Sequence, residues 1–203
     1  MTDGSSTGSE TSTRSSSLLH RDRSCLLIVD VQEKLLPVIN NHERVLESIG
    51  FLLDCASVMR IPVVMSEQYP KGLGPSVRSV AEHRAVTHVF EKLRFSAAEG
   101  FVQQPIVDLK LRPQVVVAGI ETHICVLQTA LDLLASGYQV FVVEDATGSR
   151  SSTDSASALV RIRSAGGTMC TAESVAFEWC EVAGSDEFRT ISRLVRDRDA
   201  GRR

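Results

Sequence analysis

The chain has 203 residues, 43% of them hydrophobic, which favours one sizeable domain with a full core over two small domains. Its net charge is −3 and its 22 basic residues are scattered, so neither a nucleic acid nor an anionic membrane is an expected partner. The longest apolar runs are far shorter than the ~20 residues that cross a bilayer. Small molecules or other proteins are the partners that we expect.

The cysteines are odd in number and form no C-x-x-C pair, which argues against a disulfide framework and against a zinc knuckle. We therefore expect free thiols in a reducing compartment, and a cytoplasmic location. The five cysteines are Cys25, Cys55, Cys125, Cys170 and Cys180.

Both ends of the chain are predicted to be tails. Residues 1–22 are rich in Ser, Thr and Gly and have too few apolar side chains to offset the entropy of ordering. A mitochondrial transit peptide is the weaker interpretation of this segment, because Asp3 and Glu10 are acidic and such peptides are poor in acids. We expect a disordered tail over 1–22, one domain over 23–197 and a flexible tail over 198–203.

Strands and helices are predicted to alternate along the domain. Short apolar runs predict strands, and apolar residues at helical spacing predict helices between them. The loop over 66–75 holds two prolines and two glycines, so it must be irregular. The expected strands are 25–29, 62–65, 86–90, 115–118, 138–143 and 167–170. The expected helices are 45–60, 97–109, 122–136 and 154–165, followed by two helical patterns near the C-terminus.

This alternation is typical of βαβ units with right-handed crossovers. The predicted fold class is therefore α/β, a three-layer α/β/α domain with a six-stranded, mostly parallel sheet. Ligands of such sheets bind beyond the carboxyl ends of the strands. Three residues with useful chemistry follow strand ends: Asp30, Lys92 and Cys125.

Asp30 and Lys92 have ordinary structural alternatives when each is taken alone. Asp30 follows five apolar residues, so its carboxylate should be buried and in need of a hydrogen-bond donor or a cation. A carboxylate that caps the next turn would serve equally well. A single lysine after a strand is most often solvated.

Cys125 is more informative because of its place in the chain. Thr122 is a candidate N-cap, which would put Cys125 in the first turn of a helix at the positive end of the helix dipole. That position favours thiolate over thiol, and a nearby lysine would favour it further. The alternative is a buried structural cysteine, which is the role expected for the other four.

The chain resembles the isochorismatase-like, or cysteine hydrolase, family over roughly residues 22–195, and is most similar to its isochorismatase domain-containing branch. Four stretches carry the resemblance: LLIVDVQEKL (26–35), VFEKLRFSA (89–97), VVAGIETHICVLQTALDLL (116–134) and VFVVEDATGSR (140–150). The third stretch is specific to the family, with the core pattern G-x-x-T-x-x-C-V-x-x-T-A.

The resemblance implies a catalytic triad of Asp30, Lys92 and Cys125. It also implies a cis peptide bond between Ile120 and Glu121 that aims the Glu121 N–H, with that of Cys125, at a developing oxyanion. Asp30 would accept the thiol proton and Cys125 would attack a carbonyl carbon. Loss of ammonia or an amine and hydrolysis of the thioester would follow, as in an amidase.

Departures from known members of the family narrow the reaction. Nicotinamidases bind a metal through an Asp-x-His after the second strand, where this chain has Ser66, Glu67 and Gln68. His83 and His88 do not restore the spacing, so we expect no metal and no cofactor. Isochorismatases that cleave a vinyl ether lack the nucleophilic cysteine, so Cys125 argues against that reaction.

Five further residues are candidates for the substrate pocket. One follows Asp30, three belong to the irregular loop and one follows Lys92. For the first four, a hydrogen bond that braces the loop is an equally good role, and for the aromatic near Lys92 a place in the core is the more common one. They are Gln32, Glu67, Gln68, Tyr69 and Phe95.

Two other classes of function compete with the hydrolase. A non-catalytic binding or scaffold protein could keep the fold, but it has no need of all three triad residues. A nucleotide-binding role ranks third, because no G-x-G-x-x-G or P-loop pattern is present.

The resemblance also implies a homo-oligomer, a dimer or larger. The apolar residues near the C-terminus offer a surface for such an interface. The alternative is that they simply cover the sheet. These residues are Phe177, Trp179, Phe188, Ile191, Leu194 and Val195.

Overall fold

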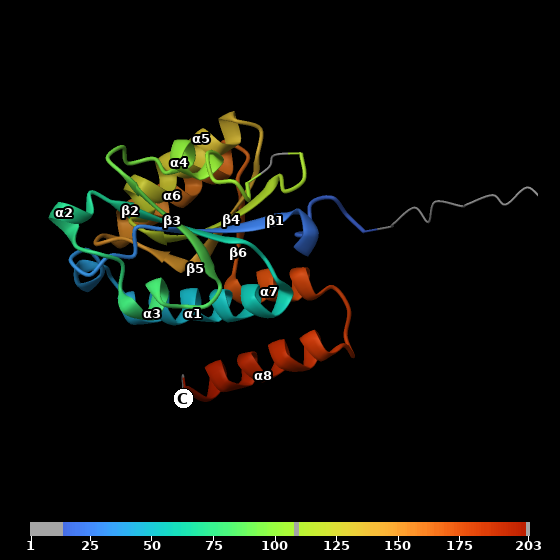
Figure 1. The fold of residues 1–203 in the computed structure, drawn as a ribbon. Coiled ribbons are helices and arrows are strands. Elements are labelled where there is room, and N and C mark those ends of the chain that lie inside the picture. The colour runs from blue at the N-terminus through green and yellow to red at the C-terminus, as the bar shows by residue number, and fades with distance from the viewer. Residues whose placement is uncertain (1–13, 108–109, 202–203) are drawn as a thin grey trace, which may run out of the picture.

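The computed structural model describes residues 14–107 and 110–201. Six parallel strands form one sheet in the order β3-β2-β1-β4-β5-β6. Helices cover both faces of this sheet (Figure 1), so the predicted three-layer α/β/α class is confirmed. The strands are β1 (Ser24–Val29), β2 (Val63–Gln68), β3 (Val86–Lys92), β4 (Gln114–Ile120), β5 (Gln139–Gly148) and β6 (Thr168–Cys170).

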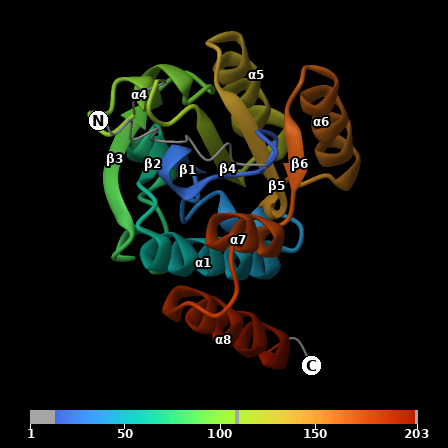
Figure 2. The same cartoon turned by 90° about the vertical axis from the view of Figure 1, so that its right-hand side faces the viewer.

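The helices lie in two layers, with α4, α5 and α6 on one face of the sheet and α1 and α7 on the other (Figure 1). Helix α8 lies outside α1 and α7, away from the sheet (Figure 2). No helix among the described residues is long and apolar enough to cross a bilayer. The helices are α1 (His42–Met59), α2 (Pro70–Leu73), α3 (Arg78–Ala81), α4 (Ala98–Val102), α5 (Leu127–Ala135), α6 (Ser152–Ser164), α7 (Ala172–Cys180) and α8 (Asp186–Gly201).

The central strand β1 is buried on both faces, which explains its continuous apolar sequence. Leu26 and Ile28 pack in the core on the side of α1 and α7, whereas Leu27 and Val29 pack on the side of α5 and α6. β1 pairs with β2 and with β4, and the chain reverses its direction of winding between β1 and β4. The carboxyl ends of these two strands therefore form the switch point at which such sheets bind ligands.

The structure differs from the sequence-based helix over 97–109. Helix α4 ends at Val102, and Pro105 gives the reason: its ring disfavours helical backbone at Gln104 and it has no N–H to donate. Residues 108 and 109 lie outside the described part of the chain.

The boundaries of both predicted tails also differ from the structure. Within the predicted N-terminal tail, Leu19 is fully buried and the Arg14 guanidinium donates a 2.7 Å hydrogen bond to the Glu178 carbonyl, so residues 14–22 belong to the fold. At the other end, α8 continues to Gly201 rather than ending before 198. Residues 1–13 and 202–203 lie outside the described residues.

Most of the apolar residues near the C-terminus cover the domain instead of forming a free surface. Trp179 and Ile191 are buried, and Phe188, Leu194 and Val195 pack against the core on the side of α1. Exposed apolar side chains occur in several parts of the chain, and three of them lie on and after the edge strand β3, at Val89, Leu93 and Phe95.

Arg198 anchors α8 to the domain, and its loss should be measurable. Its side chain is 6% exposed, and the guanidinium donates to Glu47 Oε1 at 2.8 Å and to Asp145 Oδ2 at 3.1 Å. Arg198→Met should lower the free energy of unfolding by about 1.5–3 kcal/mol in urea denaturation, because charge-assisted hydrogen bonds are lost. The exposed Arg196→Met on the same helix is the control, with an expected change within ~0.5 kcal/mol. Equal effects of the two substitutions would contradict the anchoring role.

Candidate active site

Asp30 directly follows β1 at the switch point and is completely buried. Its carboxylate accepts one hydrogen bond from Ser66 Oγ at 2.8 Å and one from Lys92 Nζ at 2.7 Å. Its backbone has φ of 53°, a left-handed conformation that Asp adopts more readily than most residues. A buried carboxylate without donors would be costly, so these two partners are what allow Asp30 to lie there.

Lys92 ends the edge strand β3, and its side chain reaches back over β2 to Asp30 with 6% of its surface exposed. Besides Asp30, its ammonium donates to Gln68 Oε1 at 2.7 Å and to the Phe95 carbonyl at 2.8 Å. A lysine has three protons to donate, and three acceptors at these distances satisfy all of them. The ammonium is therefore held in one orientation beside the Asp30 carboxylate.

Cys125 lies in the turn after β4, and its residue surface is 5% exposed. Burial, followed by the Asp30 charge, raises the pKa of the Cys125 thiol to about 12, while Lys92 opposes the shift. Hydrogen bonds to Asp30 and to Lys92 also act on this pKa, so the sulfur adjoins both groups. The three predicted triad residues are thus together, with the cysteine as a neutral thiol in the resting protein.

The local structure around Cys125 corrects two expectations. Residues Thr122–Val126 form one π-helical turn that leads into α5, and its N-cap residue is Glu121. Thr122 is therefore not the cap, and its buried Oγ1 has no hydrogen-bond partner among the described residues. The expected thiolate at a helix N-terminus is also wrong, because burial and the Asp30 carboxylate raise the pKa of the thiol by more than Lys92 lowers it.

The segment that leads to this turn has special backbone geometry. The peptide bond between Ile120 and Glu121 is cis, at the position that the resemblance indicated. Glu121 is mostly buried, and its carboxylate accepts from the backbone N–H and from the Nε of Arg150, both at 3.1 Å. These bonds attach the turn to the segment that joins β5 to α6.

Gly119 precedes this segment, with φ of 126°, and no side chain fits there. An added Cβ would lie 2.1 Å from the Val29 carbonyl oxygen, one residue before Asp30. Gly119→Ala should therefore lower the free energy of unfolding by about 2–4 kcal/mol, from backbone strain and overpacking together. Gly50→Ala in α1 meets no atom within 4 Å and should instead stabilise by about 0.5–1 kcal/mol. Chemical denaturation measures both, and the same sign for both would contradict the predicted clash.

The polar side chains of the irregular loop mainly make hydrogen bonds that hold the loop in place. The Gln32 amide donates to the Gln68 and Gly74 carbonyls and accepts from the Gln68 N–H, so it braces the loop. Glu67 does the same through the Ser76 N–H, at 2.7 Å. Gln68, the last residue of β2, contacts the triad as Ser66 does, because its side-chain oxygen accepts from Lys92.

Neither of the two aromatic candidates lies in the core, which was the alternative role for Phe95. The side chains of Tyr69 and Phe95 are each about half exposed, and Phe95 reaches the triad only through its carbonyl, which accepts from Lys92. A pocket role for both remains a prediction. Sequence reasoning missed Ser66, although its place at the end of the strand after Asp30 was a usable signal.

The metal ligands of the nicotinamidase type are absent from this site. Ser66 and Gln68 are engaged with Asp30 and Lys92, and no carboxylate–histidine pair replaces them. Within 14–107 and 110–201, no three His, Cys, Asp or Glu side chains are grouped so as to hold a metal ion. The residues of this site therefore do not fit such a metal.

Comparison with known proteins agrees with the fold. A sequence model described as the isochorismatase domain matches residues 24–174. The chain is 38% identical over 177 residues to isochorismatase domain-containing protein 2 of Bos taurus, which covers 86% of this chain and 83% of that protein.

Two solved structures are similar over nearly their full length. The MAR1 ribonuclease of Caenorhabditis elegans has 34% identity and a TM-score of 0.82, covering 88% of this chain and 92% of that one. The YcaC gene product of Escherichia coli has 25% identity and a TM-score of 0.81, covering 93% and 96%. The latter is described as an octameric hydrolase of unknown specificity.

These matches support a hydrolase as the general class of this protein. The family match spans most of the chain, and the relatives match across most of their own length. The chain belongs to the isochorismatase family, in the branch of the isochorismatase domain-containing proteins.

Proposed function

We propose that the protein is a metal-independent cysteine hydrolase that cleaves a small amide or a related carbon–nitrogen bond through a thioester on Cys125. The observation that carries this proposal is the buried ion pair of Asp30 and Lys92 at 2.7 Å, next to a buried thiol. A buried ion pair is a poor source of stability, because desolvation offsets most of the attraction. A chemical role explains why this pair adjoins a cysteine.

In the first step, Asp30 accepts the proton of the Cys125 thiol as the sulfur attacks the carbonyl carbon. The negative charge moves from the carboxylate through the sulfur to the carbonyl oxygen, and Lys92 compensates it without giving up a proton. The Glu121 and Cys125 N–H groups are proposed to donate to the resulting oxyanion. A thiol with a raised pKa suits this order of events, because the proton leaves only when the base is engaged.

In the second step, the tetrahedral species collapses and the carbon–nitrogen bond breaks. Asp30 returns its proton to the nitrogen, so that ammonia or an amine leaves and the acyl group remains on sulfur. A water then attacks the thioester and gives a proton to Asp30. The carbon–sulfur bond breaks, the sulfur regains that proton, and the products are a carboxylic acid and ammonia or an amine.

A panel of small primary amides, scored for ammonia release, tests the proposal. We expect turnover of at least one amide by the wild-type protein and by Cys55→Ala, whose cysteine is buried in α1, and none by Cys125→Ala. Because the C. elegans relative is described as a ribonuclease, single-stranded RNA is a further arm of the panel. Cleavage of RNA but of no amide would contradict the amidase reaction and favour a ribonuclease. No turnover at all would contradict it and favour a non-catalytic binding or scaffold protein.

We also propose that the protein self-associates, since the E. coli relative is described as octameric and apolar side chains are exposed along β3. Light scattering on the purified chain should give a mass at least twice that of one chain, and Leu93→Lys should reduce it. A monomer at micromolar concentration would contradict this expectation.

A further inference from the structure

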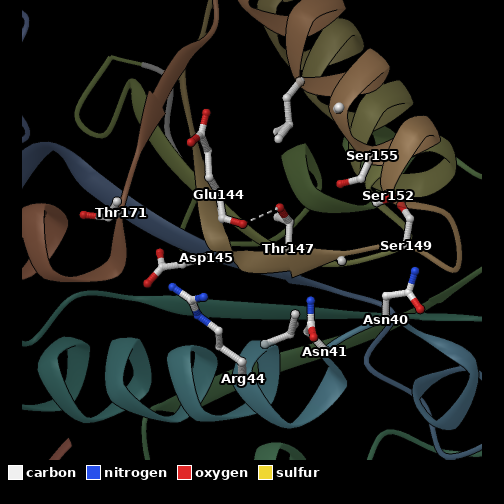
Figure 3. Close-up of a pocket in the computed structure, with 14 residues that line it drawn as sticks. Asn40, Asn41, Arg44, Glu144, Asp145, Thr147, Ser149, Ser152, Ser155 and Thr171 are labelled. Atoms are coloured by element: carbon white, nitrogen blue, oxygen red, sulfur yellow. Dashed lines mark hydrogen bonds between the residues drawn. The ribbon is translucent and has the colours of Figure 1, made fainter. Parts of the chain in front are cut away.

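A cavity lies at the carboxyl end of β5, away from the triad. It has a volume of about 470 Å³, is open to solvent and is lined by the start of α1, the end of β5 and the first turns of α6 (Figure 3). Neither Asp30, Lys92 nor Cys125 lines it. Ser149 lies between this cavity and the turn of Thr122–Val126, and its hydroxyl forms a 3.0 Å hydrogen bond with His123 Nδ1.

The acidic groups of this cavity already have partners within the protein. The Asp145 carboxylate accepts from the Ala172 N–H at 2.8 Å and from the Arg198 guanidinium at 3.1 Å. Glu144 accepts from Arg163 at 3.2 Å. Arg44 is an exposed residue that extends from α1 toward Asp145 of β5 (Figure 3), but no carboxylate of a described residue lies within ion-pair distance of it. Among the described residues, the Arg44 guanidinium is thus a charged group at the cavity that forms no ion pair.

Several polar side chains around Arg44 also lack partners. The side chains of Asn41, Ser152 and Ser155 line the cavity and make no hydrogen bond to another described residue. Thr147 is only 6% exposed, and its hydroxyl makes a single long contact of 3.4 Å, to the Glu144 carbonyl. Hydrogen-bond donors thus face the cavity from both α1 and α6, and a nearly buried hydroxyl lies between them.

We propose that this cavity binds the oxyanion group of a small molecule, a phosphate or a carboxylate. Arg44 would supply the charge, because a guanidinium donates two parallel hydrogen bonds to an oxyanion. Asn41, Ser152 and Ser155 would supply further donors that the protein itself does not use. This site is separate from the triad and does not depend on the reaction proposed there.

Thermal unfolding in the presence of anions tests the proposal. Inorganic phosphate and acetate are titrated separately, with the ionic strength held constant by sodium chloride. At least one of them should raise the unfolding midpoint of the wild-type protein in a saturable manner. Arg44→Gln should need at least ~10-fold more of the same anion, because a charge-assisted hydrogen bond is lost. The arm that stabilises identifies phosphate or carboxylate as the preferred group.

The matched control is Arg161→Gln, which removes an exposed arginine of α6 that does not line the cavity. It should titrate like the wild-type protein, and Ser155→Ala should weaken the response in the same direction as Arg44→Gln. Identical titrations of all four proteins, or no response to either anion, would overturn the proposal. The extent of Cys125 labelling by iodoacetamide should not fall at saturating anion, and protection of Cys125 would place the anion at the triad instead.

Discussion

Asp30→Asn should slow amide turnover by ~10²–10⁴-fold and at the same time make Cys125 easier to alkylate at pH 8. Asn cannot accept the thiol proton, so the first chemical step loses its base. The Asp30 charge is also one of the causes that raise the pKa of Cys125, so its removal lowers that pKa toward the ordinary thiol value. Each unit of decrease raises the thiolate fraction at pH 8 about tenfold.

Two measurements on the same preparations check this prediction: ammonia release from an amide that the wild-type protein turns over, and the rate of iodoacetamide labelling of Cys125 by peptide mass. Glu144→Gln is the control, since that carboxylate is paired with Arg163 and is not among the groups that shift the pKa of Cys125. It should change neither rate. If turnover and labelling both fell in Asp30→Asn, the carboxylate would be maintaining the structure rather than acting as the base.

Lys92→Met should lower the free energy of unfolding by about 3–5 kcal/mol at pH 7, because it leaves the buried Asp30 carboxylate without its cation. Met keeps the apolar stem of the side chain, so the change isolates the ammonium group. Urea denaturation at pH 7 measures the loss.

A double-mutant cycle separates this pair from ordinary surface pairs. The double variant Asp30→Asn with Lys92→Met should be less destabilised than the sum of the single variants, since no charge is left unpaired. Arg163→Met removes an exposed ion pair of similar length with Glu144 and should cost at most about 1 kcal/mol. Additive single effects at the triad would contradict a coupled, buried ion pair.

Much of the fold could be predicted from the sequence, because β1 and β4 are continuous apolar runs of strand length that only a sheet covered on both faces can bury. Apolar residues over 97–109 predict a longer helix than α4, which ends at Val102, because Pro105 disfavours helical backbone before it. The tails were misplaced for another reason. Leu19 and Arg198 are each held in place by residues far away in the sequence, and local composition does not reveal such contacts.

The sequence predicts that Asp30, Lys92 and Cys125 lie close together, but it does not predict the protonation state of the cysteine. Asp30, Lys92 and Cys125 each follow a strand end or a strand-like run, and parallel strands bring such ends to one edge. The protonation state of Cys125 depends on burial and on the carboxylate beside it, and neither can be read from the sequence around the cysteine. The same holds for the unpaired Thr122 hydroxyl, because a π-helical turn replaces the expected first turn of an α-helix.

The covalent role of Cys125 is tested most directly by acid-quenching the protein during turnover of an active amide and measuring the mass of the Cys125 peptide. An acyl group equal in mass to that of the amide, minus the hydrogen that it replaces, should be found on Cys125 of the wild-type protein. It should be absent from the peptides of Cys25 and Cys55. Amide turnover that persists in Cys125→Ala, with no acylated peptide in the wild-type protein, would contradict the thioester mechanism.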